Sequence, residues 1–195
     1  MPYEINGSTS DCYEGTTCLI NKMNIRNEQE LAVFEKISTL GNISILEQNP
    51  IQGNFDFEHY KAIHRFIFQE LYDWAGTIRT VNLSKKGTQF APANEIERIG
   101  SAIFSRLENE KLFVNLEHDV FVEKVTDLYC DINYLHPFRE GNGRVQRVFF
   151  NQLIQHAGYH IDFSKMDIDE LMIATIHASH GVTDYLKQFF KNNIK

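Results

Sequence analysis

Residues 135–147 read LHPFREGNGRVQR, and the rest of the chain is best interpreted outward from this stretch. Apolar residues then recur at helical spacing at Val145, Val148, Phe149 and Leu153, so the glycines stand at the entrance of a helix. Unpaired backbone N–H groups and the positive end of the helix dipole make such an entrance an anion site, and glycine lets a phosphate approach the backbone closely. The stretch therefore predicts a phosphate-binding loop that opens a helix.

Charged side chains in the same stretch supply the parts of phosphate-transfer chemistry. Arg144 and Arg147 are three residues apart, so both can reach one anion from one helix face, and a guanidinium holds phosphate oxygens in pairs. Glu140 can hold Mg²⁺, which prefers one or two carboxylates together with phosphate oxygens. His136 can accept a proton near neutral pH. These residues together predict a nucleotide-phosphate transfer site.

Length and composition favour one soluble domain over residues 1–195. The net charge of −7 argues against a non-specific partner among nucleic acids or anionic membranes, which would need a basic face. The three cysteines, Cys12, Cys18 and Cys130, form no disulfide framework, which favours reduced thiols and a cytoplasmic protein. No apolar run approaches the roughly 20 residues of a membrane span, and the first ten residues lack the apolar core of a signal peptide.

Apolar periodicity predicts an all-α fold. The expected helices cover about 27–49 (with an interruption near Gly41), 56–75 (stopped by Gly76), 92–109, 117–135, 142–157, 167–178 and 182–191. Residues 78–90 instead alternate in polarity around a Lys-Lys-Gly-Thr turn, which predicts a β-hairpin containing the only strands of the chain. The catalytic loop and its helix span 136–157.

Two stretches resemble a known family. HPFREGNGRVQR is similar to the Fic motif H-x-F-x-[D/E]-G-N-G-R-x-x-R at every fixed position, and LYDWAGTIRTVNLSKKGTQFAP resembles the segment leading into and through the Fic flap, the hairpin that covers the active-site groove. The likeness extends roughly from Tyr13 to Phe190. It implies a Fic-type helical bundle with one β-hairpin flap near the active site.

The resemblance implies a protein adenylyltransferase, or AMPylator, that transfers AMP from ATP to a Ser, Thr or Tyr hydroxyl of a target protein with the help of Mg²⁺. His136 would deprotonate the hydroxyl, Phe138 would anchor the nucleotide-binding loop in the core, and Glu140 would hold the metal. The remaining nucleotide-binding residues would be the anion hole of Gly141, Asn142 and Gly143, and the phosphate-gripping Arg144 and Arg147.

The flap would dock the target as an added strand, through residues Ile78, Lys85, Lys86, Gly87 and Thr88. The resemblance is to the stand-alone toxin branch of the family, in which a small antitoxin protein restrains the enzyme. It suggests the ATPase subunits of DNA gyrase and topoisomerase IV as targets. An effector delivered to a host cytosol and acting on host GTPases is the rival. Neither the donor base nor the oligomeric state is indicated by the sequence.

Three alternative functions stay open. A Doc-like protein kinase would carry Lys in place of Gly143, another nucleotide could replace ATP, and a catalytically silent peptide-binding module would have no use for His136 and Glu140 together. Residues 10–15, SDCYEG, formally fit an internal inhibitory motif with Glu14 as its glutamate, but the preceding Gly and Ser residues favour inhibition by a separate partner. His59 and His64 are interpreted as packing or surface histidines.

Overall fold

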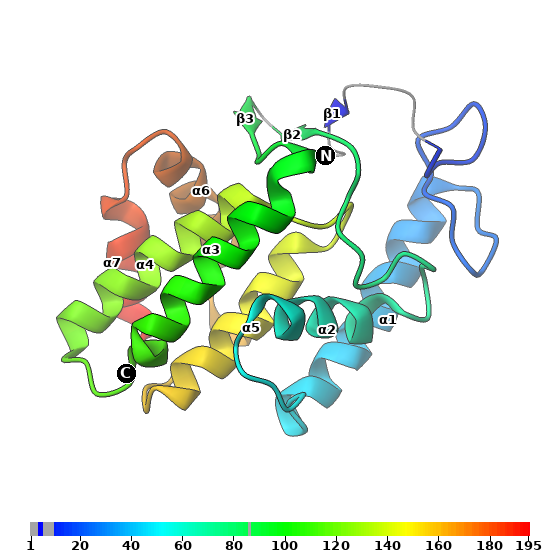
Figure 1. Ribbon diagram of the computed structural model, residues 1–195. Coiled ribbons are helices and arrows are strands. Elements are labelled where there is room, and N and C mark those ends of the chain that lie inside the picture. The colour runs from blue at the N-terminus through cyan, green and yellow to red at the C-terminus, as the bar shows by residue number, and fades with distance from the viewer. Residues whose placement is uncertain (1–3, 6–9, 86) are drawn as a thin grey trace.

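The computed structural model describes residues 4–5, 10–85 and 87–195 (Figure 1). Its helices are α1 (Glu28–Gln48), α2 (Phe57–Phe68), α3 (Ile96–Asn109), α4 (His118–Leu135), α5 (Asn142–His156), α6 (Ile168–Ser179) and α7 (Asp184–Asn193), and its strands are β1 (Glu4–Ile5), β2 (Leu83–Lys85) and β3 (Thr88–Gln89). Short 3₁₀ turns cover Ala93–Glu95, Lys111–Phe113 and Phe163–Lys165. The predicted helical fold with a small hairpin is confirmed.

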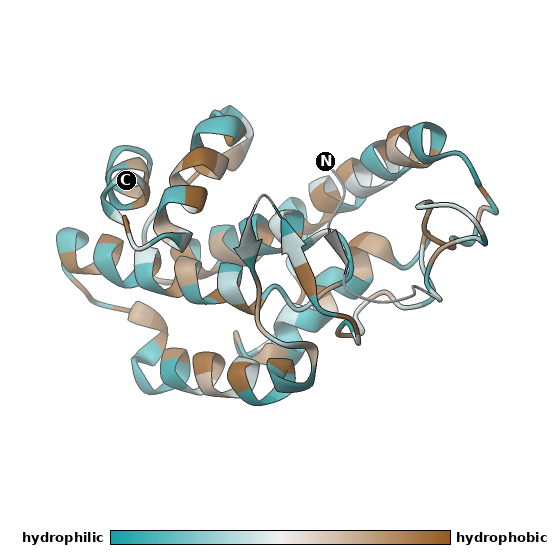
Figure 2. Cartoon of the chain, turned by 90° about the horizontal axis from the view of Figure 1, so that it is seen from above, coloured by the Kyte–Doolittle hydropathy of each residue, from teal (hydrophilic) through white to brown (hydrophobic). Residues whose placement is uncertain are grey.

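Helix α5, which begins with the glycine-rich motif, lies at the centre of the molecule. It packs against α1 and α2 on one side and α4 on the other, while α3, α6 and α7 pack around α4 (Figure 1). Phe149 of α5 is fully buried, and its ring meets those of Tyr60 and Phe104 edge-on. Seen from above, the strands lie over the middle of this helical body (Figure 2). The fold thus holds the start of α5 beneath the flap.

Side-chain caps explain where several helices begin. The side chains of Asn27, Asp56 and Asp167 each accept backbone N–H groups from the first turn of α1, α2 and α6. Such caps satisfy donors that have no partner within the helix. The starts predicted at 27, 56 and 167 are therefore confirmed to within a residue.

Two predicted helix boundaries are wrong. Helix α1 is not interrupted near Gly41, because the next residue, Asn42, donates its side-chain amide to the carbonyls of Phe66 and Ile67 in α2. Helix α2 ends at Phe68 and does not continue to Gly76. The buried side chains beyond α2 kept a helix-like spacing, although the backbone there is a series of turns.

The flap is shorter than predicted, and it has a third strand. The sheet is antiparallel in the order β1-β2-β3, so the expected hairpin at 78–90 contracts to 83–89 and gains a partner from the amino-terminal segment. Ile78 precedes the hairpin and packs, half-buried, against the core. The backbone N–H of Arg79 donates to Pro137 O at 2.8 Å, so this part of the chain pairs with the catalytic loop.

No helix in the described part of the chain is long and apolar enough to cross a membrane.

Candidate active site

His136 ends α4 in a backbone conformation that is unusual for a side chain of its size. Its φ and ψ are 41° and 59°, and its N–H donates to Ile132 O at 3.1 Å. A left-handed conformation of this kind costs on the order of 1–3 kcal/mol in a residue other than glycine and occurs mainly where the surrounding structure enforces it. Helix α4 ends here, and His136 lines the same cavity as Gly143 in the first turn of α5.

The loop between α4 and α5 is closed by its own asparagine. Asn142 is buried; its Oδ1 accepts the N–H of Phe138 at 2.9 Å, and its Nδ2 donates to Phe138 O at 2.7 Å. Phe138 is fully buried and stacks on Tyr60 and on His64. Asn142 can therefore offer a phosphate its backbone N–H, whereas Phe138 holds the loop in place from the core.

Gly141 is the position of the motif at which no other residue fits. Its φ is 81°, and a Cβ there would lie 2.1 Å from the ring of Phe68. Its N–H donates to Oε1 of Glu140 at 2.8 Å, whereas the N–H groups of Asn142 and Gly143 have no acceptor among the described residues. Two amides at the start of α5 thus remain for an anion, as the sequence predicts.

The imidazole of His136 is held as a neutral base in one tautomer. Its Nδ1 donates to Asn133 O at 3.1 Å, so in the neutral ring Nε2 carries no proton and can accept one. Phe90 stacks on the ring at a centroid distance of 3.7 Å, and the residue is 8% exposed. Burial, with a smaller contribution from the cations Arg79 and Lys85, lowers the pKa of His136 to about 3.

Arg79 contacts both the flap and the loop of the motif, although its sequence surroundings give no sign of this. It is buried, and its guanidinium donates to three carbonyls, those of His136, Val81 and Ala91, at 2.6–2.8 Å. Val81 and Ala91 flank the flap hairpin. One side chain therefore joins the base of the flap to the backbone of His136; no short motif around Arg79 signals these contacts.

His64 of α2 does more than pack in the core. It accepts the N–H of Gly76 on Nδ1 at 2.8 Å, and its Nε2 donates to Glu140 O at 3.1 Å. Burial lowers the pKa of His64 to about 3, which keeps the ring neutral, and it stacks on Phe138. The interpretation as a packing histidine is correct as far as burial goes, but the residue also fixes the backbone of the glutamate in the motif.

The two arginines of the motif differ in their surroundings. Arg144 donates to Glu35 of α1 at 2.5 Å and to Thr39 at 3.1 Å, and it lies 3.4 Å from Glu140. Glu35 also accepts the hydroxyl of Tyr72. Arg147 is half-buried, and in the described part of the chain its guanidinium has no hydrogen-bond or ion-pair partner. Arg147 is thus the one of the two that stands ready for an anion.

Glu140 suits a metal that arrives together with phosphates. Its Oε1 is engaged by Gly141 and Arg144, whereas Oε2 has no partner in the residues that the structure describes. No cluster of three or more potential metal ligands occurs in that part of the chain. A single carboxylate fits Mg²⁺ only where nucleotide phosphates and water complete the coordination, which is how this ion commonly binds.

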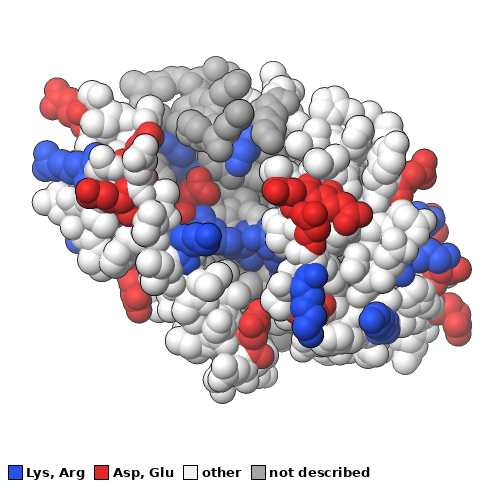
Figure 3. Space-filling model, turned by 180° about the vertical axis from the view of Figure 1, so that it is seen from behind, with Lys and Arg blue, Asp and Glu red and all other residues white. Residues whose placement is uncertain are grey.

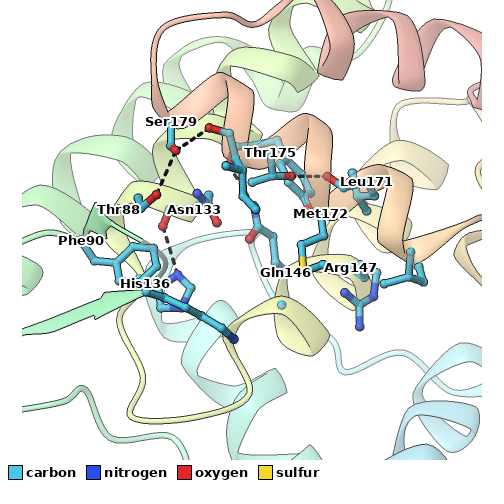
Figure 4. Close-up of a pocket in the computed structure, with 15 residues that line it drawn as sticks. Thr88, Phe90, Asn133, His136, Gln146, Arg147, Leu171, Met172, Thr175 and Ser179 are labelled. Atoms are coloured by element: carbon cyan, nitrogen blue, oxygen red, sulfur yellow. Dashed lines mark hydrogen bonds between the residues drawn. The ribbon is translucent and has the colours of Figure 1, made fainter. Parts of the chain in front are cut away.

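A cavity of about 250 Å³ brings His136, Gly143 and Arg147 together, whereas Glu140 and Arg144 are not among the residues that line it. His136 and Phe90 lie at one end and Arg147 at the other, with Gln146 on the floor (Figure 4). Its far wall comes from α6, a helix for which the sequence suggested no role; the lining residues there are Ile168, Leu171, Met172, Thr175, Ile176 and Ser179. On the face shown in Figure 3, the surface is hollowed near its centre, and Lys and Arg side chains gather along the hollow.

The predicted flap residues do not all reach this cavity. Lys85 and Thr88 line it, and the Thr88 hydroxyl hydrogen-bonds that of Ser179 at 3.2 Å. Gly87 is exposed in the turn with a φ of 78°. Ile78 precedes the hairpin, so its predicted place in a strand is wrong, and its role in target docking stays a prediction. Lys86 lies outside the described residues.

The segment carrying Glu14 is not an inhibitory helix. Residues 10–20 form turns and an isolated bridge between Cys12 and Leu19, and Glu14 is exposed. Asp11 of this segment instead pairs with Arg139 of the catalytic loop at 2.7 Å. The backbone here lacks the helical form that the motif requires.

Arg147 and the free amide of Gly143 can stabilise negative charge in the same cavity as the neutral base His136, whereas the α6 side of the cavity is largely apolar. Enzymes that move a phosphate-containing group onto a hydroxyl work in this way, by positioning and charge neutralisation. The class of protein defined by the fold and the site is therefore a nucleotide-dependent group transferase.

Comparison with known proteins identifies the family. The chain belongs to the Fic/DOC family, whose model matches residues 54–154. It is 35% identical over 182 residues to the probable protein adenylyltransferase Fic of Salmonella typhimurium, covering 93% of this chain and 90% of that protein. The corresponding protein of Escherichia coli is 37% identical over 178 residues, which are 91% and 88% of the two chains.

Solved structures agree with this assignment. BepC, a VirB-translocated effector of Bartonella tribocorum with bound AMPPNP, superposes with a TM-score of 0.88 at 27% identity, covering 95% of this chain and 96% of that one. The amino-terminal Fic domain of an effector from Bartonella quintana with bound ADP gives 0.89 at 27% identity, with 95% and 94% covered. Two structures with this fold thus hold adenine nucleotides.

Proposed function

We propose that the protein transfers AMP from ATP to a hydroxyl side chain of a target protein. It is an enzyme of the protein adenylyltransferase class, as are its named relatives. The single observation that carries the proposal is the cavity with His136 at one end and Arg147, without a partner among the described residues, at the other. A base and an anion-binding group separated by such a space fit a target hydroxyl and a triphosphate.

The chemistry follows from these positions. The target oxygen attacks the α-phosphorus, its proton passes to Nε2 of His136, and the bond to the bridging oxygen breaks so that pyrophosphate leaves. The amides of Asn142 and Gly143 would bind the phosphate oxygens, with Arg147 at the outer phosphates. Mg²⁺ held at Glu140 would supply further charge neutralisation between phosphates.

The low pKa of His136 is consistent with this role. A base with a pKa of about 3 is a weak proton acceptor, but an anionic nucleotide beside the ring favours its protonated form and so raises the pKa. Binding of the substrate would thereby activate the base. An NMR titration of His136 with and without a non-hydrolysable ATP analogue tests this step.

Gly143 favours AMP transfer over phosphate transfer. A Cβ at this position would lie 3.4 Å from Nη1 of Arg147. The lysine of Doc-like kinases would set a second cation there, whereas glycine leaves this space for the outer phosphates. The apolar side of α6 suits a flat base, although its residues do not single out adenine over other bases.

One experiment tests the reaction. Labelled ATP is added to a bacterial lysate with the wild-type protein or with His136→Ala, and the modified band is analysed by mass spectrometry. We expect a histidine-dependent adduct with the mass of AMP. An adduct with the mass of phosphate would support the kinase alternative, and binding without any adduct would support the silent module.

We further propose that a separate small protein restrains this enzyme as an antitoxin. Arg147 lacks a carboxylate partner in the described chain, and the Glu14 segment is not helical, so an inhibitory glutamate would have to come from elsewhere. The outer face of α1 exposes Val33, Phe34 and Ile37 beside an apolar groove, a surface of the kind that partners cover. If the purified chain is inactive alone, this proposal is wrong.

The toxin-like targets are proposed on the resemblance alone. If the protein is a toxin that acts in the cytoplasm of its own cell, the ATPase subunits of gyrase and topoisomerase IV should acquire label when they are incubated with labelled ATP and this protein. Host GTPases would acquire it if the protein acts as a delivered effector, as the Bartonella relatives are described. Absence of label on both topoisomerase subunits removes the first possibility.

A further inference from the structure

A second pocket lies at the end of α5 that is farthest from the flap (Figure 1). Its volume is about 810 Å³, and its walls come from the loop 50–55, the first turn of α2, the last turn of α5 and the chain around the end of α3. None of its lining residues lines the cavity at His136. An α-helix rises about 1.5 Å per residue, so Gly143 and Gln155 stand roughly 18 Å apart along α5. The pocket is therefore separate from the candidate active site.

Two residues that line this pocket have buried polar atoms without partners. Nε2 of His59, and both the amide nitrogen and the amide oxygen of Gln152, lack a hydrogen-bond partner in the described part of the chain. His59 is only 5% exposed. The described side chains contain four such atoms, so three of the four gather at one pocket. Buried polar groups are nearly always hydrogen-bonded, because an unpaired one is costly, so this gathering indicates a site that another molecule completes.

The hydrogen-bonding role of His59 is fixed by its neighbour. The backbone N–H of Phe55 donates to Nδ1 of His59 at 3.2 Å, so in the neutral ring Nε2 carries the proton. Burial lowers the pKa of His59 and outweighs the opposing effects of Asp56 and of the Ile51 backbone, so the ring is neutral at pH 7. His59 therefore offers one donor, whereas the carboxamide of Gln152 offers both a donor and an acceptor.

The loop 50–55 lies against the ring of His59. A Cβ on Gly53 would lie 2.5 Å from Cγ of His59, so only glycine lets the backbone rest there. The ring of Phe55 contacts those of His59 and His156 at centroid distances of 5.3 and 5.0 Å. A ligand that reaches Nε2 of His59 therefore shifts this loop, and a flat ring suits these aromatic neighbours.

The charges around the pocket favour a neutral ligand. Helices α3 and α5 end here, and the carbonyl end of a helix carries a partial negative charge, which disfavours an anion. The acidic and basic lining residues, Glu108 and Lys111, are exposed and of opposite sign. The unpaired atoms of His59 and Gln152 then call for two acceptors and one donor on the ligand.

We propose that this pocket binds a neutral, planar ring whose edge carries a donor between two acceptors, as the uracil ring of a nucleoside does. Its carbonyl oxygens accept from Nε2 of His59 and Nε2 of Gln152, and its ring N–H donates to Oε1 of Gln152. The volume of about 810 Å³ leaves room for the attached sugar. This inference does not depend on the proposed transfer of AMP.

Titration with uridine tests the proposal. NMR signals of the wild-type protein, including those of the His59 ring and the Gln152 side-chain amide, are followed as uridine is added. A non-hydrolysable ATP analogue is present throughout to compete for the candidate active site. We expect the signals of both residues to shift with a dissociation constant below about 1 mM, while that of Gly143 does not respond to uridine.

A modified probe and a pair of variants test the contacts. N3-methyluridine lacks the donor and should bind at least about tenfold more weakly than uridine, because Oε1 of Gln152 is left unpaired. Gln152→Met removes the carboxamide at similar volume and should weaken uridine binding about equally. Gln155→Met is the matched control, because Gln155 lines the pocket but is exposed and donates to Asn151. It should bind uridine within about twofold of wild type.

Three results would overturn the inference. Absence of any shift at about 10 mM uridine would mean that water alone satisfies the buried atoms. Shifts confined to Gly143 and Arg147 would place uridine in the cavity at His136. Equal affinities for uridine and N3-methyluridine would mean that the edge of the ring is not recognised. This last comparison uses wild-type protein, so it decides the matter even if Gln152→Met does not fold.

Discussion

The catalytic loop and the flap are built in opposite ways. In the loop, buried contacts come from several directions: Asn142 closes it, Phe138 and His64 anchor it, and a glycine packs against Phe68. In the flap, the strands are two or three residues long, and Thr88 makes the hydrogen bond to α6. The loop that we propose to carry the chemistry is thus held by many buried contacts, whereas the strands of the flap that we propose to meet target proteins are held by few.

Removal of the base should have the largest effect. His136→Ala should lower the rate of AMP transfer about 10²- to 10⁴-fold, the usual contribution of a general base, while the affinity for a non-hydrolysable ATP analogue stays within a few-fold. Single-turnover kinetics and calorimetric titration measure the two quantities. Equal losses in rate and affinity would mean that His136 binds nucleotide without acting as a base.

Adding a side chain at Gly141 should destabilise the rigidly held loop before α5. Gly141→Ala forces a Cβ against Phe68 at a positive φ, and we expect a loss of about 2–4 kcal/mol in the free energy of unfolding, with transfer strongly reduced. Urea unfolding measures the loss. Gly87→Ala, at a positive φ in the open turn of the flap, is the matched control and should cost only about 1 kcal/mol. Similar costs at both sites would contradict the difference.

Glu35 should matter for the loop although it lies on α1, outside the motif. Glu35→Gln weakens the pair with Arg144, and we expect a loss of about 1–3 kcal/mol in the free energy of unfolding, because the two side chains are largely buried. The affinity for the ATP analogue in the presence of Mg²⁺ should fall as well, since Arg144 also contacts Glu140. The exposed Glu47→Gln on the same helix is the control and should be neutral.

Acid should destabilise the protein through the loop histidines. The pKa of His136 is about 3 in the folded protein against an ordinary value of 6.5, so the unfolded state binds the proton first and stability falls as pH drops below 6.5. Between pH 6.5 and 5.5 the contribution of His136 is about 1 kcal/mol. His136→Ala should therefore lose less stability over this interval than wild type, as urea midpoints can show.

The smallest effect should come from the flap. Thr88→Ala removes the hydroxyl contact with Ser179, and the free energy of unfolding should change by less than about 0.5 kcal/mol, because the contact is exposed to water. Thermal unfolding measures this directly. A loss as large as that of Glu35→Gln would show that the flap is held more firmly than its contacts suggest.

The difference between the loop and the flap also explains which features could be predicted from the sequence. The loop was predictable because the residues of its anion site, its proposed base and its metal carboxylate lie close together in the sequence. The start of a helix also depends only on residues near it in the chain. The contacts that His64, Arg79 and Glu35 make with the loop could not be predicted, because each residue lies 57 or more positions before its partner in the chain. Nothing in the sequence around them shows which distant backbone or side chain they meet.

The flap was predictable in kind but not in extent. Alternating polarity over 78–90 indicated a hairpin. The first residues of this stretch are not in a strand, because the N–H of Arg79 donates to the carbonyl of Pro137 in the loop after α4. Strand β1 has only two residues, too few to show any period. The helices were easier, because capping residues such as Asn27 and Asp56 act within one turn of their own position.

The guanidinium of Arg79 has a consequence for how such an enzyme can diversify. It donates hydrogen bonds to one carbonyl before the hairpin, to one after it and to that of His136. The base of the flap is therefore fixed relative to His136. Residues 83–89 could then be exchanged for other sequences, by evolution or by an engineer, without moving the imidazole. If the flap docks target proteins as we propose, an exchange of this short hairpin would change the target while His136 keeps its place.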